Sequence, residues 1–195
     1  MAPAPDLPGD ASATFTDYAD TVIEAVGDRK YLIVVGHSFG GYTAPLVADR
    51  LAADLLVLVA AMIPAPGESP DEWRRDTGYA EAVRARAARD GGRTGNADPY
   101  VTFLHDVPRA LAEEAMRRER AHPSPAGRNE PWPLDAWPDV PTRFALCRED
   151  RCFPPDFLRG LAAERLGLVP DEITAGHCVA LSRPTELASL LESYR

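Results

Sequence analysis

A serine lies between glycines directly after an apolar run in the segment YLIVVGHSFGG, residues 31–41. Residues 36–40 form the pattern G-x-S-x-G, which is typical of a sharp turn from a strand into a helix. Such a turn holds the serine hydroxyl away from the backbone, and the first amides of the following helix face any negative charge that develops there. The pattern predicts that Ser38 is a nucleophile. The alternative interpretation is a glycine-rich turn in which Ser38 only caps the helix.

A neutral serine hydroxyl needs a base, and the chain contains four histidines. His177 is the predicted base, because it follows the last predicted strand, where open α/β sheets gather their functional groups. The alternative is a loop histidine that is held by nearby backbone. His37 lies inside the turn, and we expect its side chain to point away from the hydroxyl of Ser38, into the packing or the pocket wall. His105 and His122 lie among arginines and prolines and are interpreted as surface residues.

The base needs an acid that orients it. Asp150 is the predicted acid, because it lies in the turn after the preceding strand, so that two neighbouring strand ends would bring it to His177. Glu149 competes for this role, and Asp139 is a weaker candidate that lies before the strand. A surface carboxylate paired with a neighbouring arginine is the alternative for each of them.

Strands and helices must alternate along the chain to position these groups. Apolar periodicity and capping residues predict helices over 15–26, 40–51, 71–90 in pieces, 107–120 and 155–166, and a last helix with Ser182 as its N-cap and Pro184 in its first turn. In the segment 40–51, we expect Pro45 to kink the helix or to lie close to its first turn. Short apolar runs predict strands over 31–35, 55–60, 143–147 and 172–174. Continuous apolar strands between helices indicate an α/β fold, with a mostly parallel sheet and helices on both faces.

The alternation is interrupted in the middle of the chain. Residues 121–141 contain six prolines, which exclude regular structure there. We therefore predict one core, made of residues 1–63 and 139–195, with residues 64–138 inserted as a helical cap.

Composition limits the partners and the location of the protein. Thirty acidic and 21 basic residues give a net charge of −9, which repels phosphate backbones and anionic lipid, so we expect neither nucleic acid nor a membrane as a partner. The apolar run 55–63 is too short for a membrane span, and the N-terminus lacks the features of a signal peptide. Three cysteines without metal-binding spacing indicate a reducing compartment. We expect a cytoplasmic protein that needs no metal and no organic cofactor.

The chain resembles the α/β-hydrolase superfamily in the order Ser38, Asp150, His177 and in the segments GHSFGG, LLVLVA and AGHCVALSRPTELASLL. Within it, the segments APDLPGD, MIPAPGES and EDRCFPPDF are similar to the group of methylesterases and hydroxynitrile lyases. The resemblance implies that Ser38 attacks a carbonyl, that His177 takes and returns the proton, and that Asp150 holds the imidazole tautomer. It also implies that the backbone N–H of Phe39 is one donor of the oxyanion hole.

The resemblance makes the insertion a cap over the substrate pocket. Its aromatic residues are candidates for the apolar lining, although they could equally form the core of the cap itself: Trp73, Tyr79, Phe103, Trp132 and Trp137. Of the aromatic side chains, we predict His37, Trp73 and Trp132 as substrate-binding residues.

The beginning of the sequence departs from the family pattern. In the family, a strand that ends in His-Gly precedes the segment similar to APDLPGD, and the loop after it donates the second oxyanion N–H. The resemblance therefore implies an N-terminally shortened core with strand 31–35 at the sheet edge, where self-association is expected unless N-terminal residues, a partner or upstream sequence covers it. Loss of one oxyanion donor lowers the rate on the order of 100- to 1,000-fold.

Two functions of different class follow. The first is a serine hydrolase that cleaves a small, fairly apolar ester or thioester through an acyl-enzyme. The second is a shortened, catalytically impaired hydrolase-like protein that acts as a binding or interaction module. A hydroxynitrile lyase is less favoured, because the lysine that assists cyanide chemistry lies in the cap in that group, whereas Lys30 precedes the nucleophile strand. A dehalogenase or an epoxide hydrolase is disfavoured, because those members of the superfamily carry aspartate where this chain has Ser38.

Overall fold

The computed structural model describes residues 4–119 and 125–195. The chain forms two compact units, one made of Met1–Thr77 and Arg120–Phe144 and the other of Gly78–Glu119 and Ala145–Arg195. The four strands follow the order β1-β2-β3-β4. The predicted α/β fold with a parallel sheet is confirmed.

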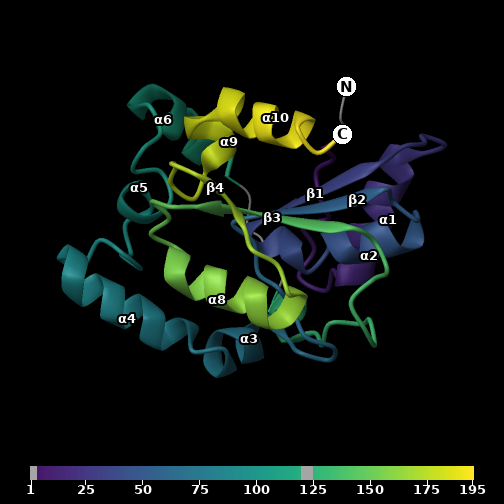
Figure 1. Ribbon diagram of the computed structural model, residues 1–195, viewed down its shortest axis with the longest axis horizontal. Coiled ribbons are helices and arrows are strands. Elements are labelled where there is room, and N and C mark those ends of the chain that lie inside the picture. Colours follow the sequence, from purple (N-terminus) through teal and green to yellow (C-terminus); the bar gives the residue numbers. More distant parts are fainter. Residues whose placement is uncertain (1–3, 120–124) are drawn as a thin grey trace. The chain divides into compact units, whose positions relative to one another are not determined.

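The first unit is built on the parallel pair β1 (Ile33–His37) and β2 (Leu55–Val59). Ile33 lies opposite Leu55, and His37 opposite Val59. Every residue of β2 is buried, whereas β1 is half-exposed. The helix α2 (Ala44–Arg50) packs against both strands, and α1 (Phe15–Val26) packs against α2 (Figure 1). The unit also contains the 3₁₀ turn η1 (Ser38–Gly41) and the short helices α3 (Pro70–Asp76) and α7 (Pro125–Asn129).

The helix α1 begins and ends where the sequence predicts it. The Thr14 hydroxyl accepts the N–H of Asp17, and the Asp17 carboxylate accepts the N–H of Thr14, so both groups are satisfied by a capping box. The helix ends at Gly27, which adopts a φ of 59° that residues with a Cβ rarely adopt.

The second unit is built on the end of β3 (Thr142–Cys147), which pairs in parallel with β4 (Asp171–Ile173). Figure 1 shows α8 (Pro155–Leu166) on one side of these strands and α9 (Val179–Ser182) and α10 (Pro184–Glu192) on the other, as expected for helices on both faces. The remaining helices of this unit are α4 (Tyr79–Asp90), α5 (Pro99–Thr102) and α6 (Arg109–Arg117).

The segment 40–51 is a 3₁₀ turn followed by α2, and Pro45 lies in the first turn of α2, which is one of the two outcomes expected for this proline. Two local predictions are wrong. The proline-rich segment contains α7, where a proline begins the helix rather than interrupting it. Ser182 ends α9, so that Arg183 precedes the last helix.

The compact units divide the chain inside the predicted cap, after Thr77, and inside β3, after Phe144. The boundaries of core and cap at residues 64 and 138 therefore stay a prediction. In the part of the chain that is described, no helix combines the length and the apolar character that a membrane crossing requires. The cytoplasmic location also stays a prediction.

Candidate active site

The turn that carries Ser38 joins β1 to η1 in the first unit. Ser38 has a φ of 54°, a left-handed conformation that is strained for a residue with a Cβ and typical of a nucleophile turn. Its carbonyl accepts the N–H of Met62, which fixes the turn against the residues after β2.

Two glycines allow the close packing of this turn. A Cβ at Gly36 would lie 2.6 Å from the Cβ of Ala44, and a Cβ at Gly41 would lie 1.8 Å from the carbonyl oxygen of Met62. Gly36, the first glycine of the G-x-S-x-G pattern, and Gly41, the residue after the pattern, therefore allow a close approach of the backbone, whereas a Cβ at Gly40 would meet no atom within 4 Å.

The residues on either side of Ser38 have different environments. His37 is the exposed last residue of β1. The ring of Phe39 stacks on Tyr42, with centroids 5.7 Å apart, and packs at 5.9 Å from the ring of Phe15. This aromatic packing holds the backbone of Phe39 at the start of η1, where amides lack a partner within the helical turn.

Asp150 and His177 form a buried pair in the second unit. The Oδ2 atom of Asp150 lies 2.8 Å from Nδ1 of His177, and the two residues are 0% and 2% exposed. The other carboxylate oxygen accepts the N–H groups of Cys152 at 2.7 Å and Phe153 at 2.9 Å. These bonds fix the carboxylate, and an ionised Asp150 directs the ring proton of His177 to Nδ1, which leaves Nε2 as an acceptor.

Two phenylalanines hold the plane of the imidazole ring. Phe103 and Phe153 each contact His177 edge-on, with ring centroids 5.4 Å away. Two aromatic rings therefore border the imidazole, and the carboxylate of Asp150 contacts its Nδ1 atom.

The structure pairs His177 with Asp150 and not with the competing acids. Glu149 is exposed, and its backbone N–H donates to the carbonyl of Ala175. Asp139 is exposed before β3, in the first unit.

His105 is half-buried rather than a plain surface residue. Its Nε2 atom lies 3.0 Å from the carbonyl oxygen of Glu149, which places it against the turn that carries Asp150. The fourth histidine, His122, lies outside the described residues.

Sequence reasoning did not single out Asp106, which holds the loop before His177. Its Oδ2 atom accepts the N–H of Gly176 at 2.7 Å. Its Oδ1 atom is buried and has no hydrogen-bond partner among the described residues, and it lies 2.5 Å from the position of a Cβ on Gly176. No sequence signal connects these residues, because they are far apart in the chain and Asp106 lies in no recognisable motif.

The two predicted tryptophans are both buried in the first unit. The indole N–H of Trp73 donates to the carbonyl of Ile63 at 3.0 Å, and that of Trp132 donates to the carbonyl of Tyr42 at 3.0 Å. The indole of Trp132 also packs against Trp137, with centroids 5.6 Å apart. Contact of Trp73, Trp132 or His37 with a substrate stays a prediction.

Two cysteines beside the pair carry protonated thiols. Burial and the negative charges of Asp150 and Asp106 raise the pKa of Cys178 to about 11. The same causes, burial first, raise the pKa of the Cys147 thiol. Neither thiol is an activated nucleophile near neutral pH.

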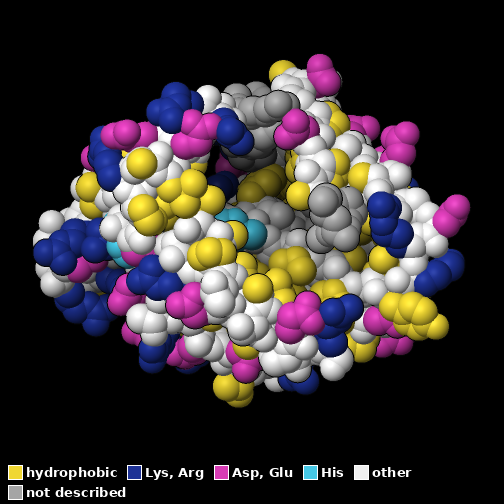
Figure 2. Space-filling view, turned by 90° about the horizontal axis from the view of Figure 1, so that it is seen from above, with side chains coloured by type: hydrophobic (Ala, Val, Ile, Leu, Met, Phe, Trp, Pro, Cys, Tyr) yellow, Lys and Arg dark blue, Asp and Glu magenta, His cyan; other side chains and the backbone are white. Residues whose placement is uncertain are grey.

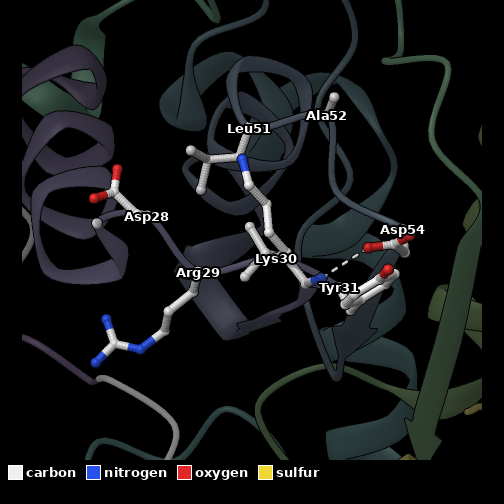
Figure 3. Close-up of a pocket in the computed structure, with 9 residues that line it drawn as sticks. Asp28, Arg29, Lys30, Tyr31, Leu51, Ala52 and Asp54 are labelled. Carbon is white, nitrogen blue, oxygen red and sulfur yellow. Dashed lines mark hydrogen bonds between the residues drawn. The ribbon is translucent and has the colours of Figure 1, made fainter.

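A cavity of about 490 Å³ opens at the beginning of β1 (Figure 3). Residues 27–32, Leu51, Ala52 and Asp54 line it, and the Asp54 carboxylate accepts the N–H of Leu32 at 2.8 Å. It lies at the end of the strand opposite to Ser38, so it is not a cavity of the nucleophile turn.

The parallel α/β fold, the strained turn at Ser38 and the chain order of Ser38, Asp150 and His177 together point to one class of protein, the α/β hydrolases. The chain belongs to the alpha/beta hydrolase family, whose model matches residues 3–190. No curated protein is a significant match to the sequence.

Solved structures share the fold. Polyneuridine aldehyde esterase is similar at 19% identity and a TM-score of 0.69, over 93% of this chain and 79% of that one. A pyrethroid hydrolase from Sphingobium faniae JZ-2 is 20% identical, with a TM-score of 0.70, over 98% and 84%. An extracellular alpha/beta-hydrolase from a Paenibacillus species is 20% identical, with a TM-score of 0.69, over 94% and 81%.

Proposed function

We propose that the protein is a serine hydrolase that cleaves a small ester or thioester through an acyl-enzyme. The observation that carries the proposal is the buried pair of Asp150 and His177, because a carboxylate on Nδ1 prepares an imidazole to act as a base through Nε2. Family membership and the strained φ of Ser38 support it.

In the proposed mechanism, Ser38 attacks the carbonyl carbon of the substrate while its hydroxyl proton moves to Nε2 of His177. Asp150 stabilises the imidazolium that forms. The backbone N–H of Phe39 donates to the oxyanion. His177 then gives the proton to the leaving alcohol or thiol as its bond to the carbonyl carbon breaks, which leaves the acyl group on Ser38. In the second half, water attacks the acyl-enzyme while its proton moves to His177, and His177 returns that proton to Ser38 as the acid is released.

The surroundings of the base favour an apolar substrate. The rings of Phe103 and Phe153 border His177, and neither offers a charged group to a ligand. The solved relatives are named as an esterase and hydrolases, which supports an ester as the substrate class. His37, Trp73 and Trp132 remain the proposed substrate contacts.

The test is covalent labelling with a fluorophosphonate probe. We expect the purified protein to be labelled at Ser38, and Ser38→Ala to abolish labelling. Ser189→Ala, on the exposed face of α10, is the matched control and should be labelled as the wild type. Equal labelling of the Ser38→Ala variant would remove the nucleophile assignment.

The proposed roles of His177 and Asp150 are tested by measuring the hydrolysis of short-chain nitrophenyl esters. We expect His177→Ala and Asp150→Asn each to lower kcat on the order of 1,000- to 10,000-fold. A folded protein without labelling or hydrolysis would favour the second function, a catalytically impaired binding module.

A further inference from the structure

Four arginines converge on a pocket of about 320 Å³ in the second unit. The pocket is lined by Arg86, Asp90, Arg93, His105, Arg148, Glu149 and Arg151, and we call it the arginine pocket. We propose that the arginine pocket binds a small oxyanion with two or more negative charges, through phosphate or carboxylate oxygens. Nothing in the proposed hydrolysis uses it.

The four guanidinium groups are not neutralised by ion pairs. Among the described residues, none of them forms a salt bridge. Arg148 donates to the hydroxyl of Thr174, and Arg151 donates to the carbonyl of Val101. Elsewhere in the chain, arginines commonly pair with carboxylates, as in Arg50, Arg74, Arg75, Arg109, Arg117, Arg118, Arg159 and Arg195. Unpaired cations are therefore concentrated in a protein whose net charge is −9.

The carboxylates of the pocket do not cancel this charge. Burial disfavours the ionised form of Asp90, but hydrogen bonds from Thr94 and Arg93 and the charge of Arg86 keep the pKa of Asp90 below its usual value. Its oxygens accept the Thr94 hydroxyl at 2.6 Å and the backbone N–H of Arg93 at 2.9 Å, so they are occupied within their own turn. Four arginines against Asp90 and Glu149 leave an excess of positive charge.

Backbone contacts tie the walls of the pocket together. The N–H of Gly95, in the loop after α4, donates to the carbonyl of Arg151 at 2.8 Å. On the other side, Nε2 of His105 lies 3.0 Å from the carbonyl oxygen of Glu149. These contacts join the α4 loop and the residues after α5 to the turn 148–151, which keeps the arginines near one another before a ligand binds.

The chemistry of the lining decides the ligand class. Guanidinium groups are planar donors that match the paired oxygens of phosphate and carboxylate groups. The volume suits a small molecule rather than a polymer, and the net negative charge of the protein repels a nucleic-acid backbone. Figure 2 shows several basic side chains, interspersed with acidic ones, on the side of the second unit that carries α4, α5 and α6.

Binding is measured by calorimetry and by thermal shift with inorganic phosphate and with citrate, at constant ionic strength set with sodium chloride. We expect saturable binding of at least one of the two anions by the wild type. The anion that saturates the binding site at the lower concentration shows whether the pocket prefers phosphate or carboxylate oxygens.

Two variants with the same change in charge test the location. Arg86→Gln with Arg93→Gln removes two arginines of the pocket, and affinity should fall about tenfold or more. The control variant combines Arg84→Gln with Arg89→Gln. Both residues lie on α4 but outside the pocket, so this variant should bind the anion as the wild type does. Absence of saturable binding by the wild type, or equal loss in both double variants, would overturn the proposal. These readouts do not involve catalysis, so they are independent of the proposed hydrolase function.

Discussion

The hydrogen bonds of Asp150 and Asp106, both in the second unit, separate two tasks. The carboxylate of Asp150 contacts the imidazole of His177, whereas the carboxylate of Asp106 accepts the backbone N–H of Gly176, the residue before His177. In the proposed hydrolase, Asp150 orients the ring and Asp106 is a positioning residue that fixes the loop carrying the ring.

Asp106→Ala should lower kcat for nitrophenyl ester hydrolysis about 10- to 100-fold with little change in KM. The reason is that the N–H of Gly176 loses its acceptor and the loop before His177 can shift, which misplaces the base. Asp106→Asn retains an oxygen acceptor and should recover most of kcat. Asp156→Ala, a surface carboxylate of the same unit, is the control. An Asp106→Ala enzyme with unchanged kcat would contradict the positioning role.

The thiol of Cys178 should react slowly with iodoacetamide at pH 8 in the native protein. Its pKa is raised to about 11, so the thiolate is scarce until the pH approaches that value. Mass spectrometry after alkylation at increasing pH measures this, with the urea-unfolded protein as the reactive reference. Rapid native labelling of Cys178 at pH 8, equal to the unfolded reference, would contradict the raised pKa.

The same thiol links stability to pH. Because the folded pKa of Cys178 lies above its unfolded value, the protonated thiol stabilises the fold at neutral pH, and this contribution is lost as the pH rises toward about 11. We expect the free energy of unfolding, from urea titrations at several pH values, to decrease more steeply for the wild type than for Cys178→Ala over this range. Parallel curves would contradict the linkage.

Single residues show how much of the site the sequence predicts. The tight turn at Ser38 was predictable from the G-x-S-x-G pattern, and the structure has Ser38 at a φ of 54°, whereas the role of Ser38 as a nucleophile stays a prediction. Asp150 and His177 were candidates because each follows a strand. Asp106 was not predictable, because a side chain that binds a distant backbone N–H leaves no periodicity or spacing in the sequence.

At the scale of elements, the packing of η1 depends on one glycine. We expect Gly41→Ala to lower the free energy of unfolding by about 1–3 kcal/mol, because its Cβ would overlap the carbonyl oxygen of Met62 and the backbone would have to move. Gly40→Ala is the matched control, since a Cβ at Gly40 meets no atom within 4 Å. Urea unfolding measures both variants. Equal stability of the two variants would contradict the packing argument.

Helices and strands are predicted well from the sequence where several local signals agree. They are predicted poorly where a proline can either begin a helix or interrupt one. The helix α1 has a capping box, an apolar face and a terminal glycine, and its predicted bounds are confirmed. The strands were found within two residues because they are apolar and short. The proline-rich segment that contains α7 is predicted to be irregular, because its composition suggests that prolines interrupt any helix there. A proline can also begin a helix, as Pro125 does, and composition does not distinguish these two cases.

At the scale of the whole molecule, the strand order leaves β1 at an edge of the sheet. In the described part of the chain, β1 pairs only with β2, and Val35 in its middle is 44% exposed. An apolar edge strand with open backbone groups is a template for pairing with another chain. The sequence-based expectation of an exposed edge therefore agrees with the strand order, whereas self-association through it stays a prediction.

We expect the protein to self-associate as its concentration increases, and Val35→Lys to weaken this association. A lysine at the edge places a charge that must lose its hydration when two strands pair, and natural edge strands use lysine in this way. Val169→Lys is the matched control, because Val169 is also an exposed valine, at 92%, but lies before β4 in the second unit. Sedimentation velocity over a range of concentrations measures all three proteins. A wild type that stays monomeric throughout, or an equal effect of both substitutions, would show that the edge of β1 does not mediate assembly.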